Sequence, residues 1–194
     1  MKENTKASNR RQYQKLFTDR VFVGEGLEAC SLTDITNTIS FPKITSLDRI
    51  EWATDLLRIK KSNGSNKLQY NFLNFPVSLH IMDDPIDFIK RSADYLVPGG
   101  YLILTVPDED LYEAGQFPSI RNGQCKRTFS IYKEKSWSPV HLNLLSELQN
   151  LPEYEVIKLE LIDTNFDYNN IKSDQTFDAN AGVECFIEIV LKKV

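Results

Sequence analysis

Two stretches of the chain carry hydrophobic patterns regular enough to predict strands. Residues 101–106 (Tyr-Leu-Ile-Leu-Thr-Val) are almost wholly apolar, and a strand without a polar face has to be covered on both sides. Residues 183–191 alternate instead, with apolar side chains at every second position and Glu184 and Glu188 among those between. We therefore predict a central strand with parallel neighbours at 101–106 and an antiparallel strand with one solvent-facing side at 183–191.

A helix is predicted just before the central strand. Asp84 is suited to cap a helix, and Pro85 is suited to its first turn. Residues 98–100 (Pro-Gly-Gly) are expected to end it, and an aromatic-rich strand at 70–75 precedes it. The helix has four apolar residues on one face: Ile86, Ile89, Ala93 and Leu96. Strand, helix and strand together form a βαβ unit.

The remaining patterns predict shorter elements. They are a helix at 8–18 that starts at Ser8 and carries Tyr13 and Phe17 on one face, strands at 20–30, 44–50 and 154–162, and a helix beginning at Ser138-Pro139. The order of elements predicts an α/β fold with a mostly parallel sheet, whose functional site lies at the carboxyl ends of the strands. We expect an N-terminal arm or helix at residues 1–19 and one domain at 20–194.

Composition narrows the class of protein. The net charge is −4, which argues against nucleic acid as a partner, because phosphate binding needs clustered Lys and Arg. The one basic cluster, from Arg10 and Arg11 to Lys15, is interpreted as a solvated helix face. No apolar run is long enough to span a membrane, and the first residues lack a secretory pattern. Three cysteines without a CxxC spacing and only two histidines favour reduced thiols, no metal site and a cytoplasmic protein.

Several motifs resemble one family. Residues 71–75 (Asn-Phe-Leu-Asn-Phe), His80, the pair Asp84-Pro85 and residues 96–101 (Leu-Val-Pro-Gly-Gly-Tyr) resemble the core of class I S-adenosylmethionine-dependent methyltransferases. More narrowly, a bacterial subfamily of small methyltransferase-domain proteins resembles four further pieces of the chain: 106–113 (Val-Pro-Asp-Glu-Asp-Leu-Tyr-Glu), 117–119, Lys126 and 135–139 (Lys-Ser-Trp-Ser-Pro). The resemblance covers most of residues 20–194. It implies a Rossmann-like, seven-stranded, mostly parallel sheet with an antiparallel last strand.

The resemblance also implies a set of site residues. S-adenosylmethionine would lie against Glu28 and Cys30 after the first strand, against Asp48 at the end of the second, and near the backbone of Phe75. A carboxylate such as Asp48 can accept hydrogen bonds from two vicinal ribose hydroxyls.

The same resemblance supplies candidates for chemistry. His80 is the catalytic candidate, and Asp108, Tyr112 and Lys126 are the candidates for substrate binding. His80 is either a general base or a buried histidine bonded to a carboxylate. Asp108 and its neighbours Glu109 and Asp110 either bind substrate hydroxyls or a metal, or are solvated loop acids.

The glycine-rich turn of the family is altered in this chain. Cys30 and Leu32 stand where glycines let the backbone approach the cofactor. Of the usual His-x-Leu-Glu-His stretch only His80 remains, and residues 122–127 stand where the subfamily tends to carry Asp-His-Lys-Trp. Two functions therefore stay open. One is a methyltransferase that O-methylates a sugar or surface-glycan precursor. The other is a catalytically inactive relative that acts as a binding or partner subunit, in a homo- or hetero-oligomer.

Overall fold

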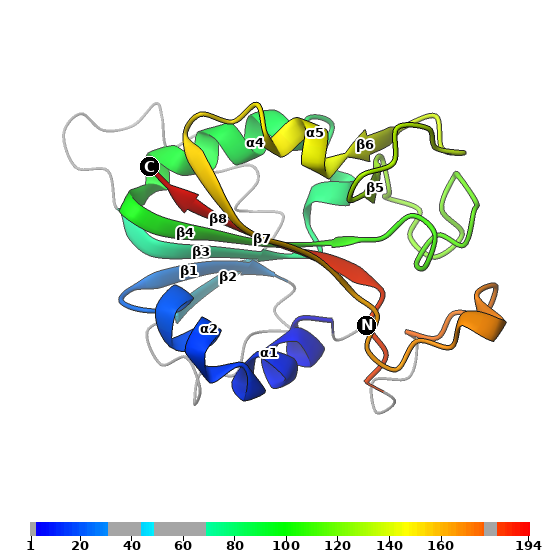
Figure 1. The fold of residues 1–194 in the computed structure, drawn as a ribbon, viewed down its shortest axis with the longest axis horizontal. Helices are drawn as coiled ribbons and strands as arrows, with labels where there is room; N and C mark the ends of the chain where they lie inside the picture. Colours follow the sequence, from blue (N-terminus) through cyan, green and yellow to red (C-terminus); the bar gives the residue numbers. More distant parts are fainter. Residues whose placement is uncertain (1–2, 31–43, 49–68, 177–181) are drawn as a thin grey trace.

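The computed structural model describes residues 3–30, 44–48, 69–176 and 182–194 of the 194-residue chain. Within them a six-stranded sheet forms the centre of the molecule, with the strand order β2-β1-β3-β4-β8-β7 (Figure 1). Its strands are β1 (Gly26–Cys30), β2 (Ile44–Asp48), β3 (Tyr70–Pro76), β4 (Leu96–Pro107), β7 (Tyr154–Ile162) and β8 (Phe186–Lys193). Strands β2, β1, β3 and β4 run parallel to one another, and β8 is antiparallel to both β4 and β7.

The predicted fold class is confirmed, with two corrections. The described residues contribute six strands to this sheet rather than seven. The apolar stretch 101–106 does lie inside the sheet, but only β3 is its parallel neighbour, because the antiparallel β8 pairs along its other edge. A buried, two-sided apolar strand needs cover on both faces, and that need does not specify the direction of its neighbours.

Helices lie on both faces of the sheet (Figure 1). One face carries α1 (Glu3–Tyr13) and α2 (Lys15–Val21), and the other carries α4 (Pro85–Ser92) and α5 (Leu144–Leu148). Short 3-10 turns complete the described part: η2 (Leu79–Ile81), η3 (Ala93–Tyr95) and η4 (Tyr168–Asn170). No helix in the described ranges is long and apolar enough to cross a membrane.

The start of α4 confirms the prediction from Asp84-Pro85. The Asp84 carboxylate accepts a hydrogen bond from the Asp87 N–H at 2.9 Å, and proline occupies the first turn. The helix ends at Ser92 rather than at the Pro-Gly-Gly stretch, which instead lies within β4 at an irregularity of the β3–β4 register. A Cβ on Gly100 would lie 2.9 Å from the Asn71 carbonyl oxygen. The close pairing of β3 and β4 therefore requires a glycine at this position.

Three other predicted elements are wrong. Residues 3–21 form two helices with a break at Gln14, so the single helix at 8–18 and the beginning of a strand at 20 are both displaced. A helix does not begin at Ser138-Pro139. A short ribbon, β5 (Thr128–Ser130) paired parallel with β6 (His141–Asn143), precedes α5. The Asn143 side chain caps α5 by accepting the Ser146 N–H, because an asparagine competes well for a helix start.

Candidate functional site

The carboxyl ends of β1 and β2 lie side by side. Cys30 and Asp48, the last residues of these strands, are partners in the parallel register. This brings two of the predicted cofactor-binding positions together at one edge of the sheet. The placement of their side chains, like the whole of Leu32, lies outside the described part of the structure.

Glu28 is the buried acid of this edge. Its side chain has 0% exposure, and its Oε1 atom accepts a hydrogen bond from Asn74 Nδ2 at 2.7 Å and another from Asn4 Nδ2 at 3.0 Å. Asn74 is the register partner of Glu28 on β3, whereas Asn4 comes from α1. The sequence prediction singled out Glu28 but neither of its two amide partners.

Phe75, the neighbour of Asn74, lies on the opposite face of β3. Its ring is buried in the main apolar cluster and packs edge-to-face on Phe88, with 4.9 Å between ring centroids. Its side chain is therefore not available for a contact with a ligand, and the predicted role of its backbone stays a prediction.

The α1 side of the sheet contains further buried polar atoms. Asn74 Oδ1 and Thr105 Oγ1 are both buried and have no hydrogen-bond partner among the described residues. An unsatisfied buried acceptor costs about 1–3 kcal/mol. A donor at this place, from water or a ligand, would remove that cost.

Glu188 on β8 is the centre of an ion cluster. Its Oε2 atom accepts hydrogen bonds from Arg11 at 2.7 Å and from Arg10 at 2.9 Å, and its Oε1 accepts one from Lys158 at 2.7 Å. Burial alone would raise the pKa of Glu188, but the three cations together hold that pKa well below its ordinary value.

These contacts correct two predictions. The basic cluster is not a solvated helix face, since Arg11 is fully buried and, among its charged residues, only Lys15 on α2 is exposed. The polar side of the 183–191 stretch does not face solvent, since Glu184, which precedes β8, and Glu188 are both buried. Alternation along β8 was identified correctly. The sequence pattern could not show that the charges on α1 and β8 neutralise one another, which is the condition for burying them.

Asp108 lies at the carboxyl end of β4 and is nearly buried. Its Oδ1 atom accepts hydrogen bonds from the backbone N–H groups of Asp110 and Leu111, both at 3.0 Å. Desolvation by burial raises the pKa of Asp108 to about 6, despite these two hydrogen bonds and the charge of Lys133. An acid with such a pKa can exchange a proton near neutral pH.

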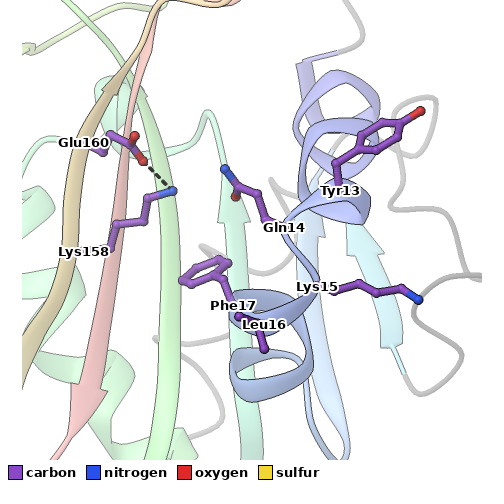
Figure 2. A pocket seen from close by; sticks show the side chains of 7 residues that line it. All are labelled: Tyr13, Gln14, Lys15, Leu16, Phe17, Lys158 and Glu160. Atoms are coloured by element: carbon purple, nitrogen blue, oxygen red, sulfur yellow. Dashed lines mark ion pairs between the residues drawn. The ribbon is translucent and has the colours of Figure 1, made fainter.

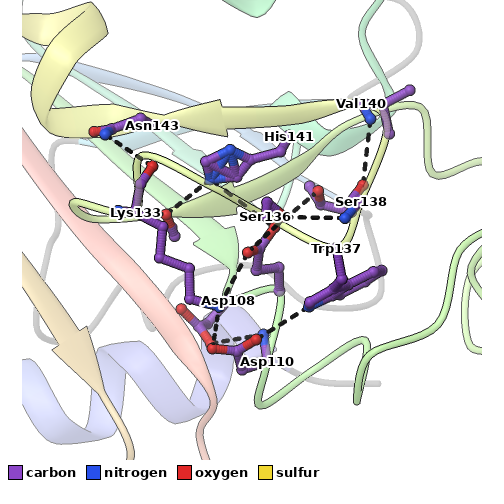
Figure 3. Close-up of polar contacts among 12 residues, drawn as sticks. Asp108, Asp110, Lys133, Ser136, Trp137, Ser138, Val140, His141 and Asn143 are labelled. Atoms are coloured by element: carbon purple, nitrogen blue, oxygen red, sulfur yellow. Dashed lines mark hydrogen bonds and ion pairs between the residues drawn. The ribbon is translucent and has the colours of Figure 1, made fainter.

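Glu109 and Asp110 attach the segment after β4 to the connection between β5 and β6, where Figure 3 shows Asp110 beside Lys133 and Trp137. Glu109 is fully buried, and its carboxylate accepts hydrogen bonds from Ser136 Oγ at 2.8 Å and Lys133 Nζ at 3.1 Å. Asp110 pairs with Lys133 and accepts from Trp137 Nε1 at 3.1 Å. The stretches at 106–113 and 135–139, which carried the narrower resemblance, are thus in direct contact.

This arrangement corrects the interpretation of the three acids as solvated loop residues. Asp108 and Glu109 are buried, and only Asp110 has an exposed side chain, at 49%. His141, predicted in the first turn of a helix, lies on β6, where its Nε2 is 2.9 Å from Ser130 Oγ.

His80 and Lys126 belong to one neighbourhood. His80, at 1% exposure, has its Nε2 atom 2.6 Å from Asn122 Nδ2, and its carbonyl oxygen accepts the Lys126 N–H at 2.7 Å. The Lys126 ammonium pairs with Asp83 at 2.8 Å. The buried-histidine interpretation fits this placement, and the Asn122 amide is one partner of the ring.

Tyr112 lies next to Asp108, whose carbonyl oxygen accepts the Tyr112 N–H. Its ring is buried against Phe186, and burial raises the pKa of its hydroxyl above the ordinary value. The Arg121 guanidinium lies 5.6 Å from the centre of the Tyr112 ring and also donates to the Ser173 carbonyl at 2.8 Å. Arg121 thereby links two loops at this edge, and no sequence signal had marked it.

Cys125 is not suited to nucleophilic chemistry. Its thiol donates to Glu113 Oε1 at 3.5 Å, and burial together with the Glu113 charge raises the pKa of Cys125 to about 12. The nucleophilic form of cysteine is the thiolate, so this thiol is protonated at neutral pH. Among the described residues, no group of three or more His, Cys, Asp or Glu side chains could hold a metal ion.

No family model matches this sequence, and neither does any curated protein. Solved structures do match over nearly the whole chain. A protein described as an S-adenosylmethionine-dependent methyltransferase from Listeria monocytogenes has a TM-score of 0.56 at 12% identity, with 97% of this chain and 99% of the other covered.

Two further matches show how varied the relatives of this fold are. The plantazolicin methyltransferase BpumL, in complex with SAH (S-adenosylhomocysteine), has a TM-score of 0.52 at 14% identity, covering 98% of this chain and 84% of the other. The cyclase SpnF has a TM-score of 0.53 at 14% identity, covering 94% and 80%. The comparison confirms the fold that the resemblance implied. It leaves the reaction open, since one fold serves both a methyltransferase and a cyclase.

Proposed function

We propose that this protein binds S-adenosylmethionine at the carboxyl ends of β1, β2 and β3 and methylates an acceptor held at the carboxyl end of β4. The observation that carries the proposal is the buried pair of Glu28 and Asn74. Their carboxylate and the unpartnered Asn74 Oδ1 are hydrogen-bond acceptors in one place. They fit an ammonium group, which has three donors and no acceptor, such as that of the cofactor's methionine part.

The cofactor supplies an electrophilic methyl group on its sulfur. In this chain Glu28 and Asn74 would hold its amino end, and Asp48, at the last position of β2, is the candidate for its ribose. Methyl transfer is an in-line displacement that depends mainly on positioning. The protein's contribution is therefore to orient two reactants and to exclude water.

We assign the acceptor side to Asp108 and Tyr112, with Lys126 at its margin. A hydroxyl that accepts a methyl group must lose its proton. Asp108 can take that proton, because its pKa of about 6 lies close to neutral pH. His80 is less suited to this step, because it is buried and its Nε2 faces Asn122.

A sugar or surface-glycan precursor is the proposed acceptor class. This rests on the narrower resemblance at 106–113 and 135–139, two stretches that the contacts of Glu109 and Asp110 with Ser136 and Trp137 bring together. We place the activity in the cytoplasm, where thiols such as Cys125 and Cys185, both free, stay reduced.

One observation favours a second candidate, a non-catalytic binding subunit. Asn4 already donates to Glu28, so the acid proposed for the cofactor is engaged within the chain itself. Cys30 in place of a glycine points the same way.

Calorimetric titration of the full chain with S-adenosylhomocysteine tests the proposal. The wild-type protein should bind, and Glu28→Gln should weaken binding by about 10- to 150-fold, since a hydrogen bond to a charged group contributes about 1.5–3 kcal/mol. The exposed Glu155→Gln on β7 is the matched control and should bind like wild type. Absence of heat and of a melting-temperature shift at millimolar ligand would exclude cofactor binding. Binding without methyl transfer to any glycan precursor would favour the non-catalytic subunit.

A further inference from the structure

Helix α1 is attached to the sheet almost entirely by polar groups. Its buried residues are Glu3, Asn4, Lys6, Ala7, Ser8 and Arg11, of which only Ala7 is apolar. The Lys6 ammonium donates to the carbonyl oxygens of Thr176 and Val183 at 3.1 and 3.0 Å. Arg10 and Arg11 of the same helix form ion pairs with Glu184 and Glu188. Polar contacts can be exchanged for contacts with water, so α1 can be released without exposing an apolar helix face, while the cost of breaking the ion pairs keeps the released state a minor one.

Helix α2 is attached differently. Val21 is fully buried, and Phe22 packs edge-to-face on Phe72 of β3, with 5.1 Å between ring centroids. The helices are separated at Gln14, whose backbone is not helical. Apolar contacts hold α2 on one side of this break, whereas mainly polar contacts hold α1 on the other side. The break at Gln14 is therefore the place where the chain can bend when α1 is released.

Open hollows lie on the surface beside the break at Gln14. One, of about 490 Å³, lies between residues 13–17 and the side chains of Lys158 and Glu160 on β7 (Figure 2). A second, of about 470 Å³, lies between α1 and residues Thr164, Gly182 and Glu184. Solvent therefore reaches α1 from both hollows.

Asn4 connects this helix to the proposed cofactor site. Its amide donates to the same Glu28 Oε1 atom that Asn74 contacts. A ligand ammonium that binds Glu28 would compete with Asn4 for that carboxylate. Docking of α1 and ligand binding at Glu28 are therefore linked through one oxygen atom.

From these contacts we infer that α1 is a detachable cover of the Glu28 site, and that its release about Gln14 opens the site to ligand. The inference rests on the proposed function for the identity of the ligand, but not for the opening itself. A protein whose binding-competent state is only partly populated shows an apparent affinity reduced by that fraction. Loosening α1 should therefore strengthen binding.

The experiment measures opening and binding separately in the full chain. Hydrogen exchange without ligand reports the opening of α1, and titration with S-adenosylhomocysteine reports binding. The test variant is Asn4→Ala, which removes the contact with Glu28. The matched control is Asn9→Ala, which makes the same change at an exposed position of the same helix. In wild type, the amides of α1 should exchange well before those of β4 and β8.

Asn4→Ala should speed exchange in α1 by about 10- to 150-fold and strengthen S-adenosylhomocysteine binding by the same factor, whereas Asn9→Ala should change neither. Exchange of α1 at the same rate as β4 in both wild type and Asn4→Ala would overturn the cover. Weaker binding by Asn4→Ala would also overturn it, by making Asn4 part of the binding surface. If no variant binds the ligand, the proposed function fails, and the exchange data alone still decide whether α1 detaches.

Discussion

The two faces of the sheet are built from different chemistry. On the α4 side, apolar residues of β3, β4 and β8, among them Leu73, Leu104 and Ile189, join Phe88 and Ile89 in one large cluster. On the α1 side the same strands also bury polar residues: Asn74, Thr105 and Glu188, with Glu28 beside them on β1. Each strand therefore contributes to both an apolar core and a polar layer.

The difference in chemistry suits the two faces of the sheet to different roles. Apolar burial is non-directional and survives small displacements, so the α4 face can hold the fold together. Buried polar groups are stable only while each has its partner, so the α1 face responds to any group that supplies or removes a partner. We therefore expect a ligand to bind on the α1 face.

The largest expected effect comes from the charge at the centre of the polar layer. Glu188→Leu leaves Arg10, Arg11 and Lys158 without their shared anion, and removing one partner of a buried ion pair costs about 3–5 kcal/mol. Urea unfolding at neutral pH measures this loss. The combined variant Glu188→Leu with Arg11→Met should recover part of it, because an apolar pair replaces an ionic one. A single change that costs under about 1 kcal/mol would contradict the picture of Glu188 as the centre of the layer.

The apolar face is tested by Leu104→Ala. Leu104 is fully buried in the main cluster, and deleting its side chain should cost about 2–5 kcal/mol through lost burial and the cavity that remains. Leu145→Ala on α5, where the side chain is largely exposed, is the control and should stay within about 0.5 kcal/mol. Leu104→Ala should lower global stability and so speed the exchange of β4, while the local opening of α1 should keep its rate. A selective release of α1 in this variant would show that the two faces are not independent.

At the carboxyl end of β4, the contribution of Asp108 to the free energy of unfolding depends on pH. The pKa of Asp108 is about 6 in the folded chain against an ordinary 3.8, so the folded state holds this proton more tightly. Its stabilising contribution is complete below pH 3.8 and is lost as the pH rises through about 6. The shift corresponds to about 3 kcal/mol at most.

Stability of wild type and Asp108→Asn, measured between pH 4 and 7.5, checks this sign. Asparagine resembles the protonated acid, so the variant should gain on wild type as the pH rises. The nearby charges that act on the same carboxyl are those of Asp110 and Lys133. A stability difference that is flat with pH would show that Asp108 titrates normally.

The apolar elements were the easier part to predict from the sequence. A run such as 101–106 or the alternation at 183–191 reflects burial directly, and Asp84-Pro85 marks a helix start by local chemistry alone. The antiparallel direction of β8 was predicted, but its position beside β4 and the strand at 141–143 were harder to predict, because they depend on which strands pair with one another.

The polar layer was missed for a different reason. Arg11 and Glu188 are 177 residues apart, and each alone has the pattern of a solvent-facing residue. Nothing local distinguishes a charge that will be neutralised from one that will be hydrated. Glu28, Asp48 and Asp108 were named as candidates through the family resemblance. Asn4 and Arg121 lie outside the motifs that carried it, and Asn74, although it belongs to the motif at 71–75, was not recognised as a partner of Glu28.

The smallest predicted effect concerns the start of α4. It distinguishes the hydrogen bond that caps this helix from the apolar contacts that attach it to the sheet. Asp84→Ala removes the carboxylate that accepts the Asp87 N–H, and loss of such a cap costs about 1 kcal/mol. Phe88 and Ile89 nevertheless stay in the apolar cluster, so α4 should remain docked. In hydrogen exchange its amides should open only with the sheet, in contrast to those of α1.

Thermal unfolding of Asp84→Ala measures the cost of losing the cap. The control is Asp87→Ala, which removes a partly exposed ion pair with Arg91 and should lose less than about 0.5 kcal/mol. Early exchange of α4 in Asp84→Ala would mean that its apolar face contributes no more to docking than the polar face of α1.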